Sequence, residues 1–225
     1  MPGYETKVES LALDGMADLV IRSLKDRQQF ADADGAAERM GISSAMWPIF
    51  GLVWPSGRIL TEHLATLELG QRRILELGCG LGLASLAMHR RGADVTASDI
   101  HPLAAAFFEA NLALNALAAI PFFGGAWSLS APELGRFDLL VGSDVLYDHS
   151  HAEDLAAFIG RHANPTAEVI IVDPNRGHRS AFRRLMLEHD FAGAVVAAPM
   201  RRFEGALPFR GQILTFTRTA GAPRR

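Results

Sequence analysis

The sequence predicts an α/β fold in which helices cover both faces of a mostly parallel sheet. From Arg73 onward, short apolar runs alternate with helical stretches, which is the pattern of consecutive strand–helix units. Such alternation favours a parallel sheet that is covered on both sides. The last two apolar runs follow one another without a helix between them, so we expect one of these two strands to be antiparallel.

The individual elements can be placed along the chain from their apolar patterns. Strands are expected over residues 72–77, 94–98, 120–123, 137–143, 168–173, 192–198 and 212–218. Helices are expected over residues 83–91, 102–114, 150–162 and 179–189. Pro102 would stand in the first turn of its helix, where proline is tolerated.

The first seventy residues lack this regular alternation. Apolar residues at 3–4 spacing predict a helix over residues 11–30, and residues 58–67 predict another. Residues 31–41 read as a loop or short helix, and the two Trp-Pro pairs within residues 47–57 indicate an irregular segment. We therefore expect residues 1–70 to form a helical cap that packs on the ligand site of a main domain, residues 71–225.

The overall composition excludes several classes of protein. The 225 residues, 49% hydrophobic and 21% charged, suit one ordinary globular domain with an extension. The net charge of -3 gives no general attraction to nucleic acid, so no such partner is expected. A single cysteine, Cys79, favours a reducing compartment. Neither a signal peptide nor an apolar run near the ~20 residues of a membrane span is apparent. We expect a cytoplasmic protein without a membrane partner.

A glycine-rich loop marks the candidate ligand site. Gly78, Gly80 and Gly82 follow an expected strand and open a helix, so the backbone can turn sharply and approach a ligand at free N–H groups. Asp99 ends the next strand, where its carboxylate can accept hydrogen bonds from a ribose diol. Together these features predict a nucleoside ligand, and the alternative is that the glycines serve only close packing.

Two side chains narrow the choice of nucleoside. Leu83 stands where the dinucleotide fingerprint requires its third glycine. Glu76 precedes the loop by two residues, and its charge would repel a pyrophosphate. A cofactor with a cationic amino acid tail suits this loop better, so the sequence favours S-adenosylmethionine over NAD.

The stretches "ILELGCGLGLASLA" and "VTASDIHP" resemble the first motifs of the seven-strand S-adenosylmethionine-dependent methyltransferases. Three further segments resemble the protein-lysine and nicotinamide-type N-methyltransferase group, including its electron-transfer flavoprotein lysine methyltransferases: "GLVWPSG", "PLAAAFFEANLALN" and "SDVLYD". The resemblance runs from about Trp47 to Thr217. It implies a Rossmann-like, doubly wound, seven-stranded sheet with an antiparallel last strand, the fold of class I methyltransferases, with S-adenosyl-L-methionine as cofactor.

The resemblance also implies roles for particular residues. Trp54 would lie against the cofactor, Trp127 would pack on its adenine, and Glu76 would order the glycine loop. The remaining cofactor-binding positions are implied to be Gly78, Cys79, Gly80, Asp99, Ile100 and Ser143. Asp144 and Tyr147 would face the transferred methyl group and its acceptor.

The chemistry of an amine acceptor gives Asp144 a specific role. Free lysine has a pKa of about 10.4, and the amine must arrive uncharged. An apolar, aromatic pocket favours the neutral amine, whereas a carboxylate favours the ammonium. Our hypothesis is that Asp144 binds and orients the amine, with deprotonation by water or through Tyr147. The stretch "VDPNRG" ends another strand and should border the same pocket, so Asp173, Asn175 and Arg176 are candidates to touch the substrate.

Several alternatives remain open. The leading interpretation is a protein-lysine N-methyltransferase with a protein substrate, and a small-molecule, nicotinamide-type enzyme is the second. A nucleic-acid methyltransferase is disfavoured because "SDVLYD" replaces the motif of base-amine enzymes. A non-catalytic cofactor-binding module is the third alternative. His149 and His151 with Asp148 suggest a possible metal site, but "HSHAED" fits an exposed helix start better, so no metal is expected. The sequence carries no signal for an oligomeric state.

Overall fold

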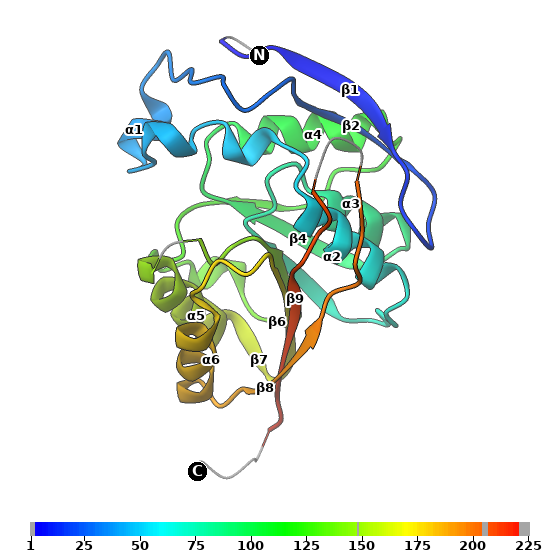
Figure 1. Cartoon of the computed structure of the whole chain (residues 1–225). Coiled ribbons are helices and arrows are strands. Elements are labelled where there is room, and N and C mark those ends of the chain that lie inside the picture. Colours follow the sequence, from blue (N-terminus) through cyan, green and yellow to red (C-terminus); the bar gives the residue numbers. More distant parts are fainter. Residues whose placement is uncertain (1–2, 148, 204–206, 221–225) are drawn as a thin grey trace.

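A seven-stranded sheet with the strand order β5-β4-β3-β6-β7-β9-β8 forms the centre of the structure (Figure 1). The computed structural model describes residues 3–147, 149–203 and 207–220, without the side chains of His149 and Ser150. The strands are β3 (Arg73–Leu77), β4 (Asp94–Asp99), β5 (Phe122–Gly124), β6 (Phe137–Ser143), β7 (Ala163–Asp173), β8 (Ala192–Ala197) and β9 (Gln212–Arg218). Strand β9 is antiparallel to both neighbours, and the other pairs are parallel. The predicted fold class is confirmed.

Helices cover both faces of this sheet (Figure 1). One face packs against α5 (His149–His162) and α6 (Arg179–Glu188), through a cluster that includes Phe158 and Phe182. The other face packs against α2 (Pro55–Ala65) and α3 (Leu83–Arg90), through Leu60 and Met88. Successive β3 residues point to opposite faces, as the two-residue period of a strand requires. The two helix layers therefore pack on opposite faces of one sheet, and together they position the loops at its carboxyl edge.

Two predicted boundaries need correction. Helix α4 runs over Ala104–Leu114, so Pro102 lies before the helix and not in its first turn. The residues ahead of the helix form a turn in which the backbone N–H of Ala104 donates to the His101 carbonyl at 3.0 Å. Strand β7 begins at Ala163, five residues before the predicted start, because Ala163 pairs with Phe137 at the beginning of β6.

The helix predicted over residues 11–30 is wrong. Strands β1 (Thr6–Leu11) and β2 (Leu19–Leu24) form an antiparallel hairpin there. Leu19 and Ile21 are fully buried while Val20 and Arg22 are only partly buried, so burial has the two-residue period of a strand. The turn between the strands holds Gly15 at a φ of 79°, a conformation that glycine adopts without strain.

The segment after the hairpin matches its prediction in part. Helix α1 (Ala36–Arg39) is the expected short helix, and two short 3-10 helices follow, η1 (Ser44–Met46) and η2 (Ile49–Gly51). The second Trp-Pro pair is not irregular: Trp54 is the N-cap of α2, and Pro55 is its first residue. Proline suits that position because its missing N–H has no partner to lose.

Two asparagines, Asn111 of α4 and its C-cap residue Asn115, hold the hairpin against the main domain. The side-chain oxygen of Asn111 accepts the Arg22 backbone N–H at 2.7 Å, and that of Asn115 accepts the Val20 backbone N–H at 3.0 Å. Four helical residues rise about 6 Å and two strand residues about 6.6 Å, so this helix spacing matches alternate residues of β2. Asn111 also donates to the Leu81 carbonyl at 3.2 Å, which ties the hairpin to the glycine-rich loop.

We predict that Asn111→Ala lowers the free energy of unfolding, because it leaves the Arg22 N–H and the Leu81 carbonyl without their partner. Each buried polar group left unsatisfied costs roughly 1–3 kcal/mol. Urea unfolding measures the loss. The control is Glu109→Ala, at an exposed position of the same helix, which should change stability by less than about 0.5 kcal/mol. Equal losses in the two variants would contradict this role of Asn111.

Candidate active site

A single cavity of about 410 Å³ at the carboxyl edge of the sheet contains the candidate site. This volume lies within the range of roughly 300–1,000 Å³ that is typical of small-molecule sites. The residues expected to bind the cofactor or to face the acceptor all line this cavity: Trp54, Glu76, Gly78, Cys79, Gly80, Asp99, Ile100, Trp127, Ser143, Asp144 and Tyr147. The structure therefore brings together residues that are spread over almost a hundred positions of the chain. Of the three further candidates to touch the substrate, Arg176 lines the cavity, whereas Asp173 and Asn175 do not.

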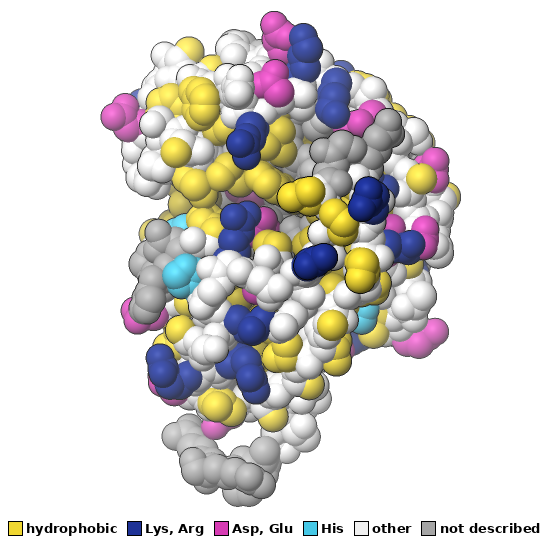
Figure 2. All heavy atoms as spheres, in the orientation of Figure 1, with side chains coloured by type: hydrophobic (Ala, Val, Ile, Leu, Met, Phe, Trp, Pro, Cys, Tyr) yellow, Lys and Arg dark blue, Asp and Glu magenta, His cyan; other side chains and the backbone are white. Residues whose placement is uncertain are grey.

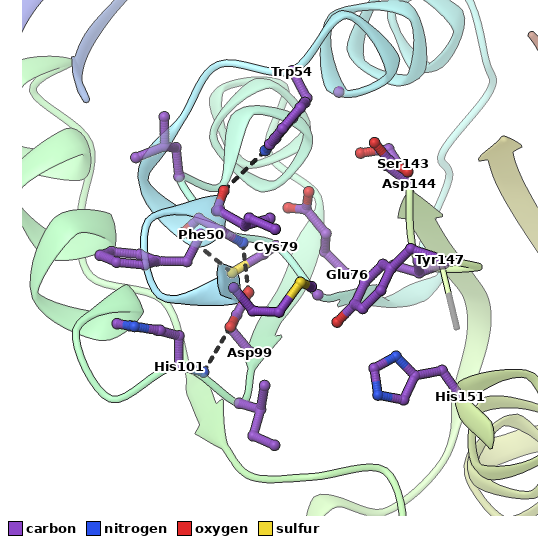
Figure 3. A pocket seen from close by; sticks show the side chains of 18 of the residues that line it. Phe50, Trp54, Glu76, Cys79, Asp99, His101, Ser143, Asp144, Tyr147 and His151 are labelled. Carbon is purple, nitrogen blue, oxygen red and sulfur yellow. Dashed lines mark hydrogen bonds between the residues drawn. The ribbon is translucent and has the colours of Figure 1, made fainter. Parts of the chain in front are cut away.

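The Asp99 carboxylate fixes the glycine-rich loop. Its two oxygens accept one backbone N–H each, from Gly80 and from His101, both at 2.8 Å (Figure 3). Gly80 has a φ of 51°, and a Cβ at this position would stand 2.7 Å from the Phe50 carbonyl oxygen. Glycine is thus required both by the backbone conformation and by the close approach of Phe50. Each carboxylate oxygen keeps a lone pair that can accept a ligand hydroxyl.

Glu76 is a buried carboxyl at the base of the same loop. One of its oxygens accepts the backbone N–H of Ser85 in the first turn of α3 at 2.8 Å, which joins the end of β3 to the helix that follows. Burial raises the pKa of Glu76 to about 7, against the lowering effect of the hydrogen bonds from Ser85. Burial also raises the pKa of the neighbouring Cys79 thiol, with a further contribution from Asp99, so this thiol is a poor nucleophile.

The N-terminal segment forms part of the cavity wall, through Phe50 and Trp54. The rings of Phe50 and His101 stack at a centroid distance of 3.7 Å and an interplanar angle of 12°. The indole N–H of Trp54 donates to the Ile49 carbonyl at 2.9 Å, which fixes this ring at the start of α2. The Phe50–His101 stack was not predicted, because no local sequence pattern connects two positions so far apart in the chain.

Aromatic rings line the side of the cavity nearest α5. The Tyr147 and His151 rings meet edge to face at 4.7 Å, and the Trp127 ring is 6.0 Å from that of His151. Figure 3 shows Tyr147 and His151 on the side opposite Phe50 and His101, with Glu76 between the two walls. His151 was missed as a member of the site and was considered only as a possible metal ligand.

Asp144 stands at the edge of the cavity and is paired with Arg176. The Arg176 Nε donates to one carboxylate oxygen and its terminal nitrogen to the other, both at 2.8 Å. Asp144 has a φ of 55°, a left-handed conformation that is uncommon outside glycine, and its N–H still bonds the Val172 carbonyl. Buried Asp173 accepts the backbone N–H groups of Asn175 and Arg176, so the loop that carries Arg176 is itself held in place.

The side chains present suit a nucleoside with a cationic tail and do not suggest a metal. Among the described residues, no three His, Cys, Asp or Glu side chains form a group that could hold a metal ion. Residue 148 and the His149 side chain, part of the rejected metal interpretation, lie outside the described residues. The Asp99 carboxylate at the end of β4 fits a ribose diol, and the buried Glu76 carboxyl that lines the same cavity fits a cationic amino acid tail.

A profile of known families matches residues 43–188, and its description is lysine methyltransferase. The chain belongs to this family. Two vertebrate relatives are each named electron transfer flavoprotein beta subunit lysine methyltransferase. The Danio rerio protein is 33% identical over 134 residues, which cover 57% of this chain and 51% of that protein. The Xenopus laevis protein is 34% identical over 138 residues, which cover 60% and 55%. The chain thus spans about half the length of these relatives.

A solved methyltransferase structure has the same fold as this chain. Magnesium protoporphyrin IX methyltransferase from Synechocystis PCC 6803, with bound S-adenosylmethionine, superposes with a TM-score of 0.53 at 21% identity. The match covers 72% of this chain and 76% of that one. The fold is that of class I methyltransferases, whose cofactor is S-adenosylmethionine. Within the described part of the chain, no helix is both long and apolar enough to cross a membrane.

We predict that Glu76 makes stability depend on pH. Its pKa in the folded protein, about 7, exceeds the ordinary value of 4.5, so between these pH values the folded state binds more protons than the unfolded state. The free energy of unfolding should therefore fall as pH rises from 4.5 to about 7, by up to about 1.4 kcal/mol per pH unit, and level off above. Urea unfolding of the protein and of Glu76→Gln across this range measures the effect. A constant difference between the two proteins would contradict it.

Proposed function

We propose that this protein is an S-adenosylmethionine-dependent N-methyltransferase that modifies lysine side chains of a protein. One observation carries the proposal: a single cavity joins the glycine-rich loop and Asp99 on one side to Asp144 and Tyr147 on the other. The glycine-rich loop and Asp99 suit the cofactor, and Asp144 and Tyr147 suit an amine acceptor. Family membership and the names of the two vertebrate relatives support a lysine acceptor.

In this proposal the two walls of the cavity have different roles. The cofactor wall holds the nucleoside and its amino acid tail, with Asp99 accepting the ribose hydroxyls and Trp127 against the adenine. The other proposed cofactor contacts come from Trp54, Glu76, Gly78, Cys79, Gly80, Ile100 and Ser143. Residues 1–70 act as the cap of the site, through Phe50 and Trp54, and residues 71–225 form the methyltransferase domain.

Methyl transfer to an amine requires mainly that the acceptor nitrogen is correctly positioned and desolvated. The cofactor supplies a methyl group on a sulfonium, which is already an activated leaving group. The chain must hold the acceptor nitrogen in line with that methyl at roughly 3–3.5 Å. The Tyr147, Trp127 and His151 rings provide an apolar surround in which a neutral amine is favoured over an ammonium. Asp144 orients the acceptor at the edge of this surround.

The pairing of Asp144 with Arg176 refines this role. A carboxylate that already accepts two guanidinium N–H groups is charge-compensated, so it favours a second cation less than a free carboxylate would. Its remaining lone pairs can still accept a hydrogen bond from a neutral amine. Arg176 thereby lets Asp144 orient the acceptor without strongly stabilising the unreactive ammonium.

We predict that Asp144→Asn reduces methyl transfer by at least about a hundredfold and leaves S-adenosylmethionine binding largely unchanged. Asparagine tolerates the left-handed backbone at this position better than alanine does, so the loop should keep its shape. Calorimetry measures cofactor binding, and transfer of labelled methyl to proteins of a cell lysate measures turnover. The matched control is Glu153→Gln, which removes an exposed carboxylate outside the cavity. Loss of cofactor binding together with turnover would contradict the division into two walls.

The same assay separates the competing functions. Label in discrete protein bands that resist nuclease supports protein methylation. Label confined to the small-molecule fraction would instead establish a small-molecule N-methyltransferase. Cofactor binding without transfer to any fraction would establish a non-catalytic cofactor-binding module.

A further inference from the structure

The surface beside the cavity mouth carries a concentration of arginine. Residues 174–211 contain seven arginines and three acidic residues, a net charge of +4, although the whole chain has a net charge of -3. Figure 2 shows several Lys and Arg side chains on the part of the surface that α6 and β8 occupy in Figure 1, among others spread over the same face. Residues 174–211 are therefore a positively charged segment of an otherwise acidic protein.

Most of these arginines have no acidic partner among the residues that the structure describes. Arg176 pairs with Asp144, and Arg201 pairs with Asp14 and Glu62. The other five form no ion pair with any acidic side chain that the structure describes, and together we call them the arginine face: Arg179, Arg183, Arg184, Arg202 and Arg210. All are exposed except Arg179, which is partly buried.

The arginine face begins at the cavity and spreads over two elements. Asn175 joins them: its side-chain oxygen accepts Arg179 of α6 at 2.9 Å, and its amide donates to the Arg210 carbonyl at 2.6 Å. The next residue, Arg176, lines the cavity. A peptide whose lysine enters the cavity beside Arg176 would therefore lay its neighbouring residues toward the arginine face.

Exposed apolar side chains accompany the arginines. Leu187 of α6 is 63% exposed and follows Arg183 by four residues, so the two share one side of the helix. Met200 and Leu207, which are 77% and 87% exposed, belong to the same β8–β9 connection as Arg202. Arginine and methionine are enriched in protein interfaces, where apolar contacts add to charge. This mixture favours a protein partner over nucleic acid.

We propose that the arginine face docks an acidic segment that flanks the methylated lysine of the acceptor protein. The inference rests on the proposed lysine methylation and adds the chemistry by which the acceptor is selected. A cationic lysine that approaches an arginine-lined mouth is repelled, and acidic neighbours offset that repulsion. Guanidinium groups also bind carboxylates through two parallel hydrogen bonds, which gives the contact geometric specificity.

The test compares two short fluorescein-labelled peptides that share a central lysine, one flanked by glutamates and the other by glutamines. Fluorescence anisotropy with the S-adenosylhomocysteine-saturated protein at low ionic strength measures binding. We expect the acidic peptide to bind about tenfold more tightly, and we expect Arg183→Glu/Arg184→Glu to abolish this preference. Added salt should reduce the preference for the acidic peptide. The control is Arg27→Glu, an exposed position outside both the cavity and the arginine face, which should retain it.

Equal binding of the two peptides, or an unchanged preference in the double variant, would overturn the proposal. A labelled single-stranded RNA that binds more tightly than the acidic peptide and depends on the same arginines would overturn it as well. Both substituted side chains are exposed, and an unchanged Tm excludes misfolding. The binding experiment needs no turnover, so methyl transfer to lysate proteins by the same preparations tests the proposed function separately.

Discussion

The hydrogen bonds of the Asp99 carboxylate are the interaction on which the site depends. By accepting the N–H groups of Gly80 and His101, this carboxylate fixes the loops after β3 and β4 relative to each other. The loop in turn receives the Phe50 carbonyl so closely that only glycine fits at position 80, which brings the N-terminal segment over the cavity. Because these are bonds within the protein, this side of the cavity, which we propose binds the cofactor, is preorganised, and little ordering remains as a cost of binding.

On the side of the cavity that we propose holds the acceptor, a carboxylate is again fixed by hydrogen bonds, but its partner is a cationic guanidinium. Asp144 is held in a left-handed conformation directly after β6, and Arg176 compensates its charge from the loop after β7. Asp173 at the end of β7 holds that loop. Carboxylates thus stand at the ends of β4, β6 and β7, yet each has different partners. The arginine face begins beside this edge, where Asn175 contacts both Arg179 and Arg210, and continues outward along α6 and the β8–β9 connection.

The sequence predicted the sheet from local patterns, and it predicted which residues line the cavity from the glycine-rich loop, from Asp99 and from the resemblance to methyltransferase segments. Parallel strands are marked by apolar runs, and the glycine-rich loop, Asp99 and "SDVLYD" each stand at the end of one. The N-terminal hairpin was mistaken for a helix because its apolar spacing fits both periods, and the deciding bonds come from Asn111 and Asn115, about ninety residues later in the chain. The Asp144–Arg176 pair escaped prediction for the same reason: sequence placed both residues near the pocket but could not show their contact.

The central claim is that the cavity delivers a methyl group to a lysine amine. The most direct measurement is tandem mass spectrometry of the proteins labelled when the purified protein is incubated with S-adenosylmethionine and a lysate of its source cell. The account predicts methyl groups on lysine side-chain nitrogens, at sites that lie beside acidic residues. Methylation confined to arginine, to carboxyl groups or to small molecules would contradict it.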